Sequence, residues 1–383
     1  MTIRIAMVAG ETSGDLLASH LIRALRQHLP DAEFFGIGGP KMEAEGFQVR
    51  WPSEMLAVHG YVDALKRYRE LSGIRRELLA QLRSEQPTAF IGVDAPDFNI
   101  WLEGKLKAGG MPAIHFISPS IWAWRGGRIK RIARSVSHML CLFPFEPELY
   151  RRAGVPVTYV GHPLADVLPL EPDRLAARRI LEISPERKVV AMLPGSRESE
   201  VRNLAERFIR TAMVMAARDP ELLFLVPLAT RATREIFDTV RHRLQATELP
   251  LRMLFGHAVD AMTAADVVLV ASGTASLEAA LLKRPMVISY RIGDWQYRLM
   301  KMLAYLPWVG LPNILCRESL VPELLQDDAT PEKLAAALQA WLDDPAACEA
   351  LAERFTRLHQ QLRQDTAHKA AMAILPYLRQ RRR

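Results

Sequence analysis

The sequence predicts an α/β protein with two Rossmann-like domains and a helical C-terminus. Short apolar runs alternate with amphipathic stretches along nearly all 383 residues, and the alternation restarts after the Pro- and Gly-marked stretch YVGHPLADVLPLEPD, residues 159–173. Apolar strands that alternate with helices are typical of a parallel sheet covered by helices on both faces. A chain of this length exceeds one compact core and suits two domains.

The first half of the chain, residues 1–165, is predicted to be the first domain. Its expected strands are the apolar runs IRIAMVA (3–9), TAFIGV (88–93) and AIHFIS (113–118). Leucines at helical spacing predict a helix after the first run, at Leu17, Leu21, Leu25 and Leu29. A second helix is expected from Phe98.

The second domain is predicted to span residues 166–345. Its expected strands are VVAMLP (189–194), LLFLVP (222–227), LRMLF (251–255), DVVLVAS (266–272) and PMVISY (285–290). From Thr330 the pattern is wholly helical. We expect residues 346–383 to pack back on the first domain or on a partner chain, as in a homodimer.

Composition excludes several classes of protein. Hydrophobic residues make up 49% and charged residues 24%, which argues against disorder. The three cysteines are far apart and form no CxxC pair, which argues against a disulfide framework or a zinc site and fits a reducing cytoplasm. The sequence contains no uninterrupted run of 18 apolar residues, so no membrane span is expected. The start, MTIRIAMVAGE, is typical of a first strand and not of a signal peptide. The net charge of +7 favours an anionic partner.

Ligands of open α/β sheets bind beyond the carboxyl ends of the strands, so the strand-to-helix turns are the candidate sites. The first, VAGETSGDLL, has glycines that allow close backbone approach. Glu11 is expected to point into a cleft, and Ser13 or Thr12 to cap the helix. The turn lacks GxGxxG, so it gives a dinucleotide site little support. An ordinary capped helix start is the alternative.

A second turn, in IGVDAPDFNI, carries Asp94 and Asp97. A carboxylate at the end of a strand lies where a general base would act. The pair also resembles a divalent-metal site, although DxxD alone specifies no coordination shell. We expect Asp97 to cap the helix from Phe98, and Asp94, which has no such local use, to be the base.

Two turns of the second domain suit an anion. In LPGSRESE, the backbone N–H groups of Gly195 and Ser196 at a helix start and the guanidinium of Arg197 suit phosphate oxygens, although a surface salt bridge to the glutamates that follow is the alternative. In VASGTASLE, Ser272, Gly273 and Thr274 repeat the design, and Glu278 lies one helical turn later, within reach of a ribose. Two such turns in one domain fit a diphosphate.

Three stretches mix cations with aromatic and apolar residues: 57–82, 118–136 and 295–315. In the second, Trp122 and Trp124 stand among five cations, a pattern that suits nucleobase stacking or a membrane headgroup interface. Core packing with a solvated basic face is the alternative. Nucleic acid is disfavoured, because long apolar faces accompany the cations and no known binding module is present.

Six motifs in order resemble one family: VAGETSGD, GVDAPDFN, SPSIWAWR, LPGSR, SGTASLE and LPNIL are similar to those of lipid-A-disaccharide synthase, a glycosyltransferase of GT-B architecture. The resemblance runs from about Ala9 to Leu325, and RLHQQLRQ (357–364) continues it. It implies two Rossmann-like domains facing across a cleft, the first for the acceptor and the second for a UDP-sugar.

The resemblance also implies a reaction. UDP-2,3-diacylglucosamine would donate its sugar to the 6-hydroxyl of 2,3-diacylglucosamine 1-phosphate, with inversion, to form a β-1,6-linked disaccharide and UDP. It implies no cofactor and no obligatory metal, and peripheral attachment to the anionic inner face of the cytoplasmic membrane.

The implied roles follow the motifs. Asp94 would be the base; Arg197, with Ser196 and the turn Ser272–Thr274, would neutralise the leaving UDP; Glu278 would hold the ribose; Glu11 and Ser13 would line the acceptor side; and Asn313 would sit at the cleft. Two alternatives remain: a UDP-sugar epimerase of the same architecture, and a non-enzymatic nucleotide-sugar binder at the membrane. A binder should tolerate Asp94→Ala, whereas an enzyme should not.

Overall fold

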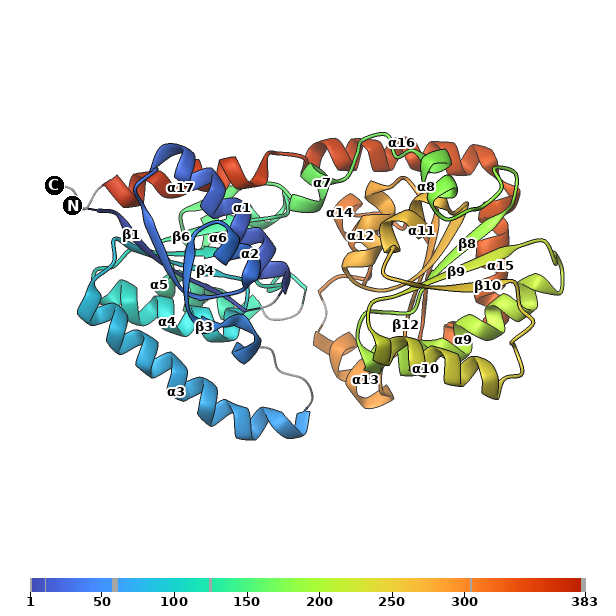
Figure 1. The fold of residues 1–383 in the computed structure, drawn as a ribbon, viewed down its shortest axis with the longest axis horizontal. Coiled ribbons are helices and arrows are strands. Elements are labelled where there is room, and N and C mark those ends of the chain that lie inside the picture. Colours follow the sequence, from blue (N-terminus) through green and yellow to red (C-terminus); the bar gives the residue numbers. More distant parts are fainter. Residues whose placement is uncertain (1, 11, 57–60, 124–125, 304, 380–383) are drawn as a thin grey trace. The chain divides into compact units, whose positions relative to one another are not determined.

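The chain divides into two units, Met1–Asp166 with Leu362–Arg383, and Val167–Gln361. The structure is a computed structural model that describes residues 2–10, 12–56, 61–123, 126–303 and 305–379 (Figure 1). For some helical residues, among them 61–69, it describes the backbone alone.

The first unit contains a seven-stranded parallel sheet in the order β3-β2-β1-β4-β5-β6-β7. Its strands are β1 (Arg4–Ala9), β2 (Glu33–Gly38), β3 (Phe47–Pro52), β4 (Ala89–Val93), β5 (Ala113–Phe116), β6 (His138–Cys141) and β7 (Val157–Tyr159). The three apolar runs predicted as strands are confirmed as β1, β4 and β5. Four strands were missed: β6 and β7 are short, and FQVRWP in β3 is only partly buried. The missed β2, EFFGIG, is six residues long and buried, so neither reason applies to it.

Helices cover both faces of this sheet (Figure 1). They are α1 (Thr12–His28), α2 (Pro40–Ala44), α3 (Tyr61–Glu85), α4 (Pro96–Ala108), α5 (Ile129–Ser135), α6 (Glu146–Arg152), α7 (Pro163–Val167) and α17 (Thr366–Arg379). Helices α1 and α17 pack on one face, where Leu21 and Leu25 share a core with Ile374 and Leu378. Helices α3 and α4 pack on the other face.

The second unit contains a six-stranded parallel sheet in the order β10-β9-β8-β11-β12-β13. Its strands are β8 (Val189–Leu193), β9 (Leu223–Leu228), β10 (Leu251–Phe255), β11 (Val267–Ala271), β12 (Met286–Tyr290) and β13 (Glu323–Leu325). All the runs predicted as strands here are confirmed, and only the three-residue β13 was missed.

The helices of the second unit also flank their sheet (Figure 1). They are α8 (Arg174–Ile180), α9 (Glu198–Ala216), α10 (Arg231–Arg243), α11 (Ala258–Ala264), α12 (Thr274–Leu281), α13 (Asp294–Leu303), α14 (Leu311–Cys316), α15 (Pro331–Asp343) and α16 (Pro345–Leu362). The core under α9 and α15 includes Phe208, Ile209 and Leu338. The predicted class, two parallel α/β units with a helical C-terminus, is confirmed.

The C-terminal helix is tied to its unit by one carboxylate. Asp166 accepts hydrogen bonds from the backbone N–H groups of Gln364, Asp365 and Thr366, at 3.0, 3.0 and 2.7 Å. A carboxylate at a helix start satisfies N–H groups that have no partner within the helix. The start of α17 is thereby fixed, although almost 200 residues separate it from Asp166.

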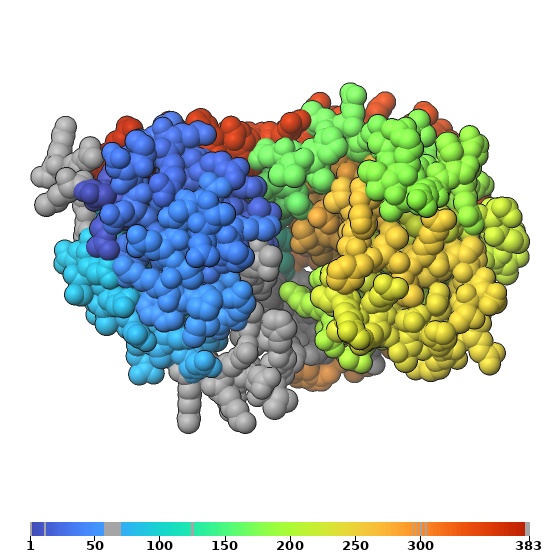
Figure 2. Space-filling view, viewed as in Figure 1, coloured from blue at the N-terminus to red at the C-terminus, as the bar shows by residue number. Residues whose placement is uncertain are grey.

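Helix α3 carries the first of the three basic, apolar stretches, and its C-terminal half forms part of the surface of the first unit in Figure 2, in light blue. Ile74 and Leu78 are buried, whereas Arg76 is exposed. In this half, core packing with a solvated basic face is therefore what the structure shows. The side chains of residues 61–69, in the N-terminal half of this helix, lie outside the described residues.

Candidate active site

The candidate turns of each unit meet at the point where the strand order reverses. In the first unit β1 lies beside β4, with Ala9 paired to Val93, so the turns that follow them are neighbours. In the second unit β8 lies beside β11, with Leu193 paired to Val270. Such switch points are where open α/β sheets bind ligands. The topology therefore brings the predicted turns together in pairs, one pair in each unit.

Asp94 follows β4 in a left-handed backbone conformation. Its φ is +55° and that of Ala95 is +43°, conformations uncommon for residues other than glycine. Two hydrogen bonds hold this turn: the Asp94 N–H donates to the Phe116 carbonyl at 2.9 Å, and Asn99 Nδ2 donates to the Asp94 carbonyl at 2.8 Å. Asn99 is fully buried. Its role was not predicted, because the sequence does not show which backbone carbonyl a side-chain amide will meet.

The Asp94 carboxylate itself is partly exposed, and among the described residues it has no hydrogen-bond or ion-pair partner. Strained positions persist where the surrounding structure fixes them, and they cluster at functional sites. A held backbone with an unengaged carboxylate is the arrangement that a general base requires.

Asp97 does not cap a helix, which corrects the expectation from sequence. Helix α4 begins at Pro96 with Ala95 as its N-cap, so Asp97 already lies in the first turn. Its carboxylate forms an ion pair with Arg128 and is 82% exposed. Within the described residues, no group of three or more His, Cys, Asp or Glu side chains is placed to hold a metal ion.

The first turn, after β1, is only partly described. Glu11 lies outside the described residues, and Ser13 is exposed in the first turn of α1. The residue with a visible role is Asp15, which sequence inspection passed over. Its buried carboxylate accepts from the backbone N–H groups of Gly39, Lys41 and Met42, at 3.1, 3.1 and 3.0 Å, and so caps α2.

The turn after β8 already holds a carboxylate. Glu200 Oε2 accepts from the N–H groups of Ser196 and Arg197, at 3.0 and 3.2 Å, and Oε1 lies 3.6 Å from the Arg197 guanidinium. The expectation that the Ser196 N–H is free for a ligand is therefore wrong for this structure, because Glu200 occupies it. The signal was present, since a glutamate at the third position of a helix is typical of a capping box. The Arg197 side chain is 74% exposed, so most of it is open to solvent.

The turn after β11 is open. Gly273 is the N-cap of α12, and no side chain caps this helix. Gly273 and Thr274 are exposed, while the Ser272 hydroxyl donates to the Val309 carbonyl at 3.1 Å. Uncapped N–H groups at a helix start form an anion site together with the helix dipole. Of the three predicted donors, Gly273 and Thr274 lie at this uncapped helix start, whereas both donors of Ser272 are engaged, because its N–H also donates to the Ser289 carbonyl at 3.2 Å.

Glu278 lies one turn into α12 and is half-buried. Burial raises the pKa of its carboxyl group above the usual value. Among the described residues it has no hydrogen-bond or ion-pair partner, so it remains available to a ligand hydroxyl.

Asn313 is engaged within its own unit. It is fully buried; its Nδ2 donates to the Val321 carbonyl and Glu323 Oε1, at 2.9 and 2.8 Å, and its Oδ1 accepts from the N–H groups of Leu320 and Val321, at 2.9 and 3.1 Å. These hydrogen bonds use the N–H donors and the carbonyl oxygen of the Asn313 amide group. Asn313 thus holds the loop before β13, so its amide group is not free for a ligand in this structure.

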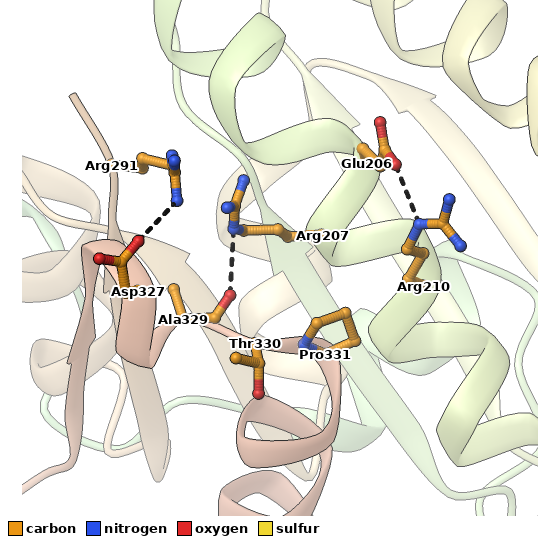
Figure 3. A pocket seen from close by; sticks show the side chains of 8 residues that line it. All are labelled: Glu206, Arg207, Arg210, Arg291, Asp327, Ala329, Thr330 and Pro331. Carbon is orange, nitrogen blue, oxygen red and sulfur yellow. Dashed lines mark hydrogen bonds and ion pairs between the residues drawn. The ribbon is translucent and has the colours of Figure 1, made fainter. Parts of the chain in front are cut away.

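A cavity of about 270 Å³ lies beside α9 and the start of α15 (Figure 3). Arg207 Nε donates to the Ala329 carbonyl at 3.1 Å, Arg291 pairs with Asp327 at 3.5 Å, and Arg210 pairs with Glu206 at 3.0 Å. Burial, and secondarily the charge of Arg291, lowers the pKa of Arg207. Each arginine has an acceptor of the protein's own, so this cavity does not require a bound anion.

Two surfaces bear on the predicted membrane contact. Trp122 is half-buried and hydrogen-bonded within the first unit, which argues against the nucleobase-stacking or headgroup role considered for it; Trp124 lies outside the described residues. Around α13, Trp295, Met302 and Tyr305 are 75%, 75% and 63% exposed. In the part of the chain that the structure describes, no helix is long and apolar enough to cross a bilayer.

The sequence matches a family model over most of its length. The model describes lipid-A-disaccharide synthetase and matches residues 5–375. The chain belongs to the lipid-A-disaccharide synthetase family. It is 79% identical over 378 residues to the lipid-A-disaccharide synthase of Azoarcus sp. (strain BH72), which covers 99% of this chain and 97% of the relative. As a member of this family, the chain is an enzyme of lipid A biosynthesis and a glycosyltransferase, as the motifs predicted.

Solved structures share the fold of this lipid-A-disaccharide synthetase family member. The glycotransferase of kitacinnamycin aligns with a TM-score of 0.64 at 18% identity, over 98% of this chain and 99% of the other. A UDP-GlcNAc 2-epimerase of Neisseria meningitidis, bound to UDP-GlcNAc, aligns with a TM-score of 0.66 at 11% identity, over 98% and 100%. At such identities only the fold is shared, so the epimerase alternative gains no functional support.

Proposed function

We propose that the chain transfers a 2,3-diacylglucosaminyl group from UDP to the 6-hydroxyl of 2,3-diacylglucosamine 1-phosphate. The observation that carries the mechanism is the unengaged Asp94 carboxylate on its held, left-handed backbone at the end of β4. Asp94 takes the proton of the acceptor hydroxyl as that oxygen attacks the anomeric carbon. The bond from this carbon to the UDP oxygen breaks, its electron pair leaves with UDP, and the configuration inverts.

The second unit is proposed to bind the UDP-sugar. Gly273 and Thr274, at the uncapped start of α12, supply N–H donors for the diphosphate, on which charge develops as UDP leaves, and Ser272 holds the start of this turn through the Val309 carbonyl. Arg197 adds a charged donor from the adjacent turn, where a phosphate oxygen competes with the Glu200 carboxylate for the Ser196 N–H. Glu278 accepts from the ribose hydroxyls.

The first unit is proposed to bind the acceptor, with Glu11 and Ser13 on the acceptor side. Both substrates are anionic lipids, so the enzyme must meet them at a membrane surface. The exposed side chains of Trp295, Met302 and Tyr305, with the chain's net charge of +7, support peripheral attachment to the anionic inner face of the cytoplasmic membrane.

The test compares Asp94→Asn with Asp97→Asn in mixed detergent micelles containing both lipid substrates and EDTA. Loss of a general base lowers kcat by about 10²–10⁴-fold, whereas Asp97→Asn, which removes only an exposed ion pair, should retain near wild-type turnover. UDP release and disaccharide formation are measured together.

Three outcomes would contradict the proposal. Full activity of Asp94→Asn would remove it as the base. Activity of the wild type only after Mg²⁺ addition would return the two aspartates to a metal role. Absence of disaccharide from the wild type with or without Mg²⁺ would overturn the function itself.

A further inference from the structure

The segment Ile117–Trp122, which follows β5, begins in a conformation that needs support. Ile117 is β-branched and has a φ of +82°, which makes it a true backbone outlier. The residue before it, Phe116, accepts the hydrogen bond from the Asp94 N–H at 2.9 Å. An outlier therefore lies one residue from the contact that places the proposed base, and something must hold the segment there.

Helix α6 supplies two ties to this segment. Glu146, its first residue, is 1% exposed; its Oε1 accepts from Trp122 Nε1–H at 3.1 Å, and its Oε2 accepts from the Phe143 N–H at 2.9 Å. One turn later, the hydroxyl of the buried Tyr150 is hydrogen-bonded to Ser118 Oγ at 2.8 Å. The two ties hold the segment near its beginning and at its end.

Burying a carboxyl group so completely is unfavourable unless it is hydrogen-bonded. Burial raises the pKa of Glu146 to about 7, and the backbone hydrogen bond from Phe143 works against that rise. An apolar residue would fill the same space without this cost. The carboxyl group is therefore best explained by what it holds, namely the backbone N–H of Phe143 and the indole N–H of Trp122.

Aromatic packing joins the same parts. Trp122 meets the edges of Phe143 and Phe145, with ring centres 6.2 and 5.2 Å apart, and Phe143 stacks on His162 at 5.7 Å. These residues follow β5, β6 and β7, so the cluster spans the carboxyl ends of three adjacent strands. Displacing Trp122 would loosen all three chain segments.

We propose that Glu146 is a positioning residue of the transfer reaction: by holding Trp122, it keeps the strained segment Ile117–Trp122, and through Phe116 the Asp94 turn, in the reactive arrangement. The inference rests on the proposed function, because it takes Asp94 as the base. Glu146 itself is 1% exposed, so its role is to position other groups and not to contact a substrate.

The test uses Glu146→Gln, which keeps the shape of the side chain but turns one acceptor oxygen into an NH₂ group that faces an N–H donor. The control is Glu148→Gln on the same helix, where the glutamate is exposed and paired with Arg152. Kinetics with both lipid substrates give kcat and each KM. Tryptophan emission reports the indole environment, with Trp122→Phe identifying the contribution of Trp122.

Glu146→Gln should lower kcat by roughly tenfold to hundredfold, the size expected when a reacting group is displaced by up to about 1 Å. The KM for the UDP-sugar, bound by the other unit, should stay within about twofold. The emission of Trp122 should change, and the control should match the wild type in every measurement. Trp122→Phe should lower kcat similarly, and the double variant should be no worse than either single one.

The outcomes separate this inference from the proposed function. Wild-type kcat in Glu146→Gln would overturn the positioning role, whatever the emission does. If wild-type enzyme forms no disaccharide, the proposed function fails, and an unchanged emission would then overturn the Glu146–Trp122 tie as well. If Glu146→Gln does not fold, as judged by circular dichroism, Trp122→Phe tests the same hydrogen bond from its other end.

Discussion

The two anion turns of the second unit look alike in sequence and differ in structure. After β8, the N–H groups of Ser196 and Arg197 are occupied by Glu200, whereas after β11 no side chain caps the helix that starts at Thr274. The N–H groups of the first turn are thus satisfied by a carboxylate of the protein, whereas those of the second turn are open to an external anion. A small-residue turn at a helix start therefore indicates an anion, but it does not indicate whether this anion is a side chain of the protein or a bound ligand.

The comparison assigns different parts of the task to the two turns. The open turn offers backbone donors fixed before the ligand arrives, which suits a diphosphate. The closed turn offers the exposed Arg197 guanidinium, already oriented by Glu200 at 3.6 Å. If this division is right, substitutions in the closed turn and in the open turn should have different effects.

Alanine at the two glycines should destabilise the closed turn more than the open one. Both backbones, with φ +122° at Gly195 and +150° at Gly273, disfavour any side chain, at a cost of about 1–3 kcal/mol. At Gly195 the new Cβ would also lie 2.4 Å from Glu200 Cβ, which adds about 1–3 kcal/mol of overpacking. Thermal unfolding of Gly195→Ala and Gly273→Ala measures both; equal losses would mean that Glu200 moves away freely.

Removing the Arg197 side chain should weaken the donor site. A hydrogen bond to a charged group contributes about 1.5–3 kcal/mol, so kcat/KM for the UDP-sugar should fall roughly 10- to 10²-fold in Arg197→Ala. The control is Arg202→Ala, which removes an exposed arginine of α9 paired with Glu198. If both variants behave like the wild type, Arg197 serves only its surface pair with Glu200.

Neutralising Glu200 should have the opposite sign. In Glu200→Gln the side-chain oxygen still accepts from the turn, but a negative charge that competes with phosphate is gone. Exposed pairs contribute about 0.2–1 kcal/mol, so the Kd for UDP should fall by up to about fivefold, with less effect at high salt. Calorimetry at two salt concentrations measures this. A weaker affinity would show that the carboxylate itself supports the ligand.

Glu278 should give the open turn a pH dependence. Because burial raises its pKa above 4.5, the folded state holds the proton more tightly than the unfolded chain. Its contribution to stability is therefore full below pH 4.5 and is lost as pH rises through the raised pKa. UDP affinity should change the other way, falling as pH falls through that pKa, by about fivefold, because a neutral carboxyl is the weaker acceptor.

Glu278→Gln provides the comparison for this prediction. Its UDP affinity should be lower than that of the wild type at high pH and flat across the same range. Calorimetric titration and thermal unfolding at matched pH values follow both quantities. Parallel curves for the two proteins would show that Glu278 does not contact the ribose.

Much of the fold was predictable, because the long buried strands are continuous apolar runs with small-residue turns after them. Those runs located β1, β4, β5 and β8–β12, and with them the turns at Asp94, Arg197 and Gly273. Short strands at the edges, such as β7 and β13, were not found, since three residues show no periodicity.

The partners of the polar side chains could not be predicted, because a sequence motif does not say which distant backbone groups need a hydrogen bond. Asp15 caps a helix more than 20 residues away, and Asp166 one that starts at Thr366. Asn313 was expected at the cleft, but its amide group is hydrogen-bonded to the loop before β13.

Local pattern and motif order in the sequence were therefore enough for the eight long apolar strands, the family and the candidate turns after those strands. Only the tertiary structure decided which of the polar side chains at those turns remain available. Burial makes every unpaired donor and acceptor unfavourable, so most find a partner within the protein, as Glu146 and Glu200 do. Among the described residues at those turns, the carboxylates of Asp94 and Glu278 have no such partner, and they are the two that we propose act on the substrates.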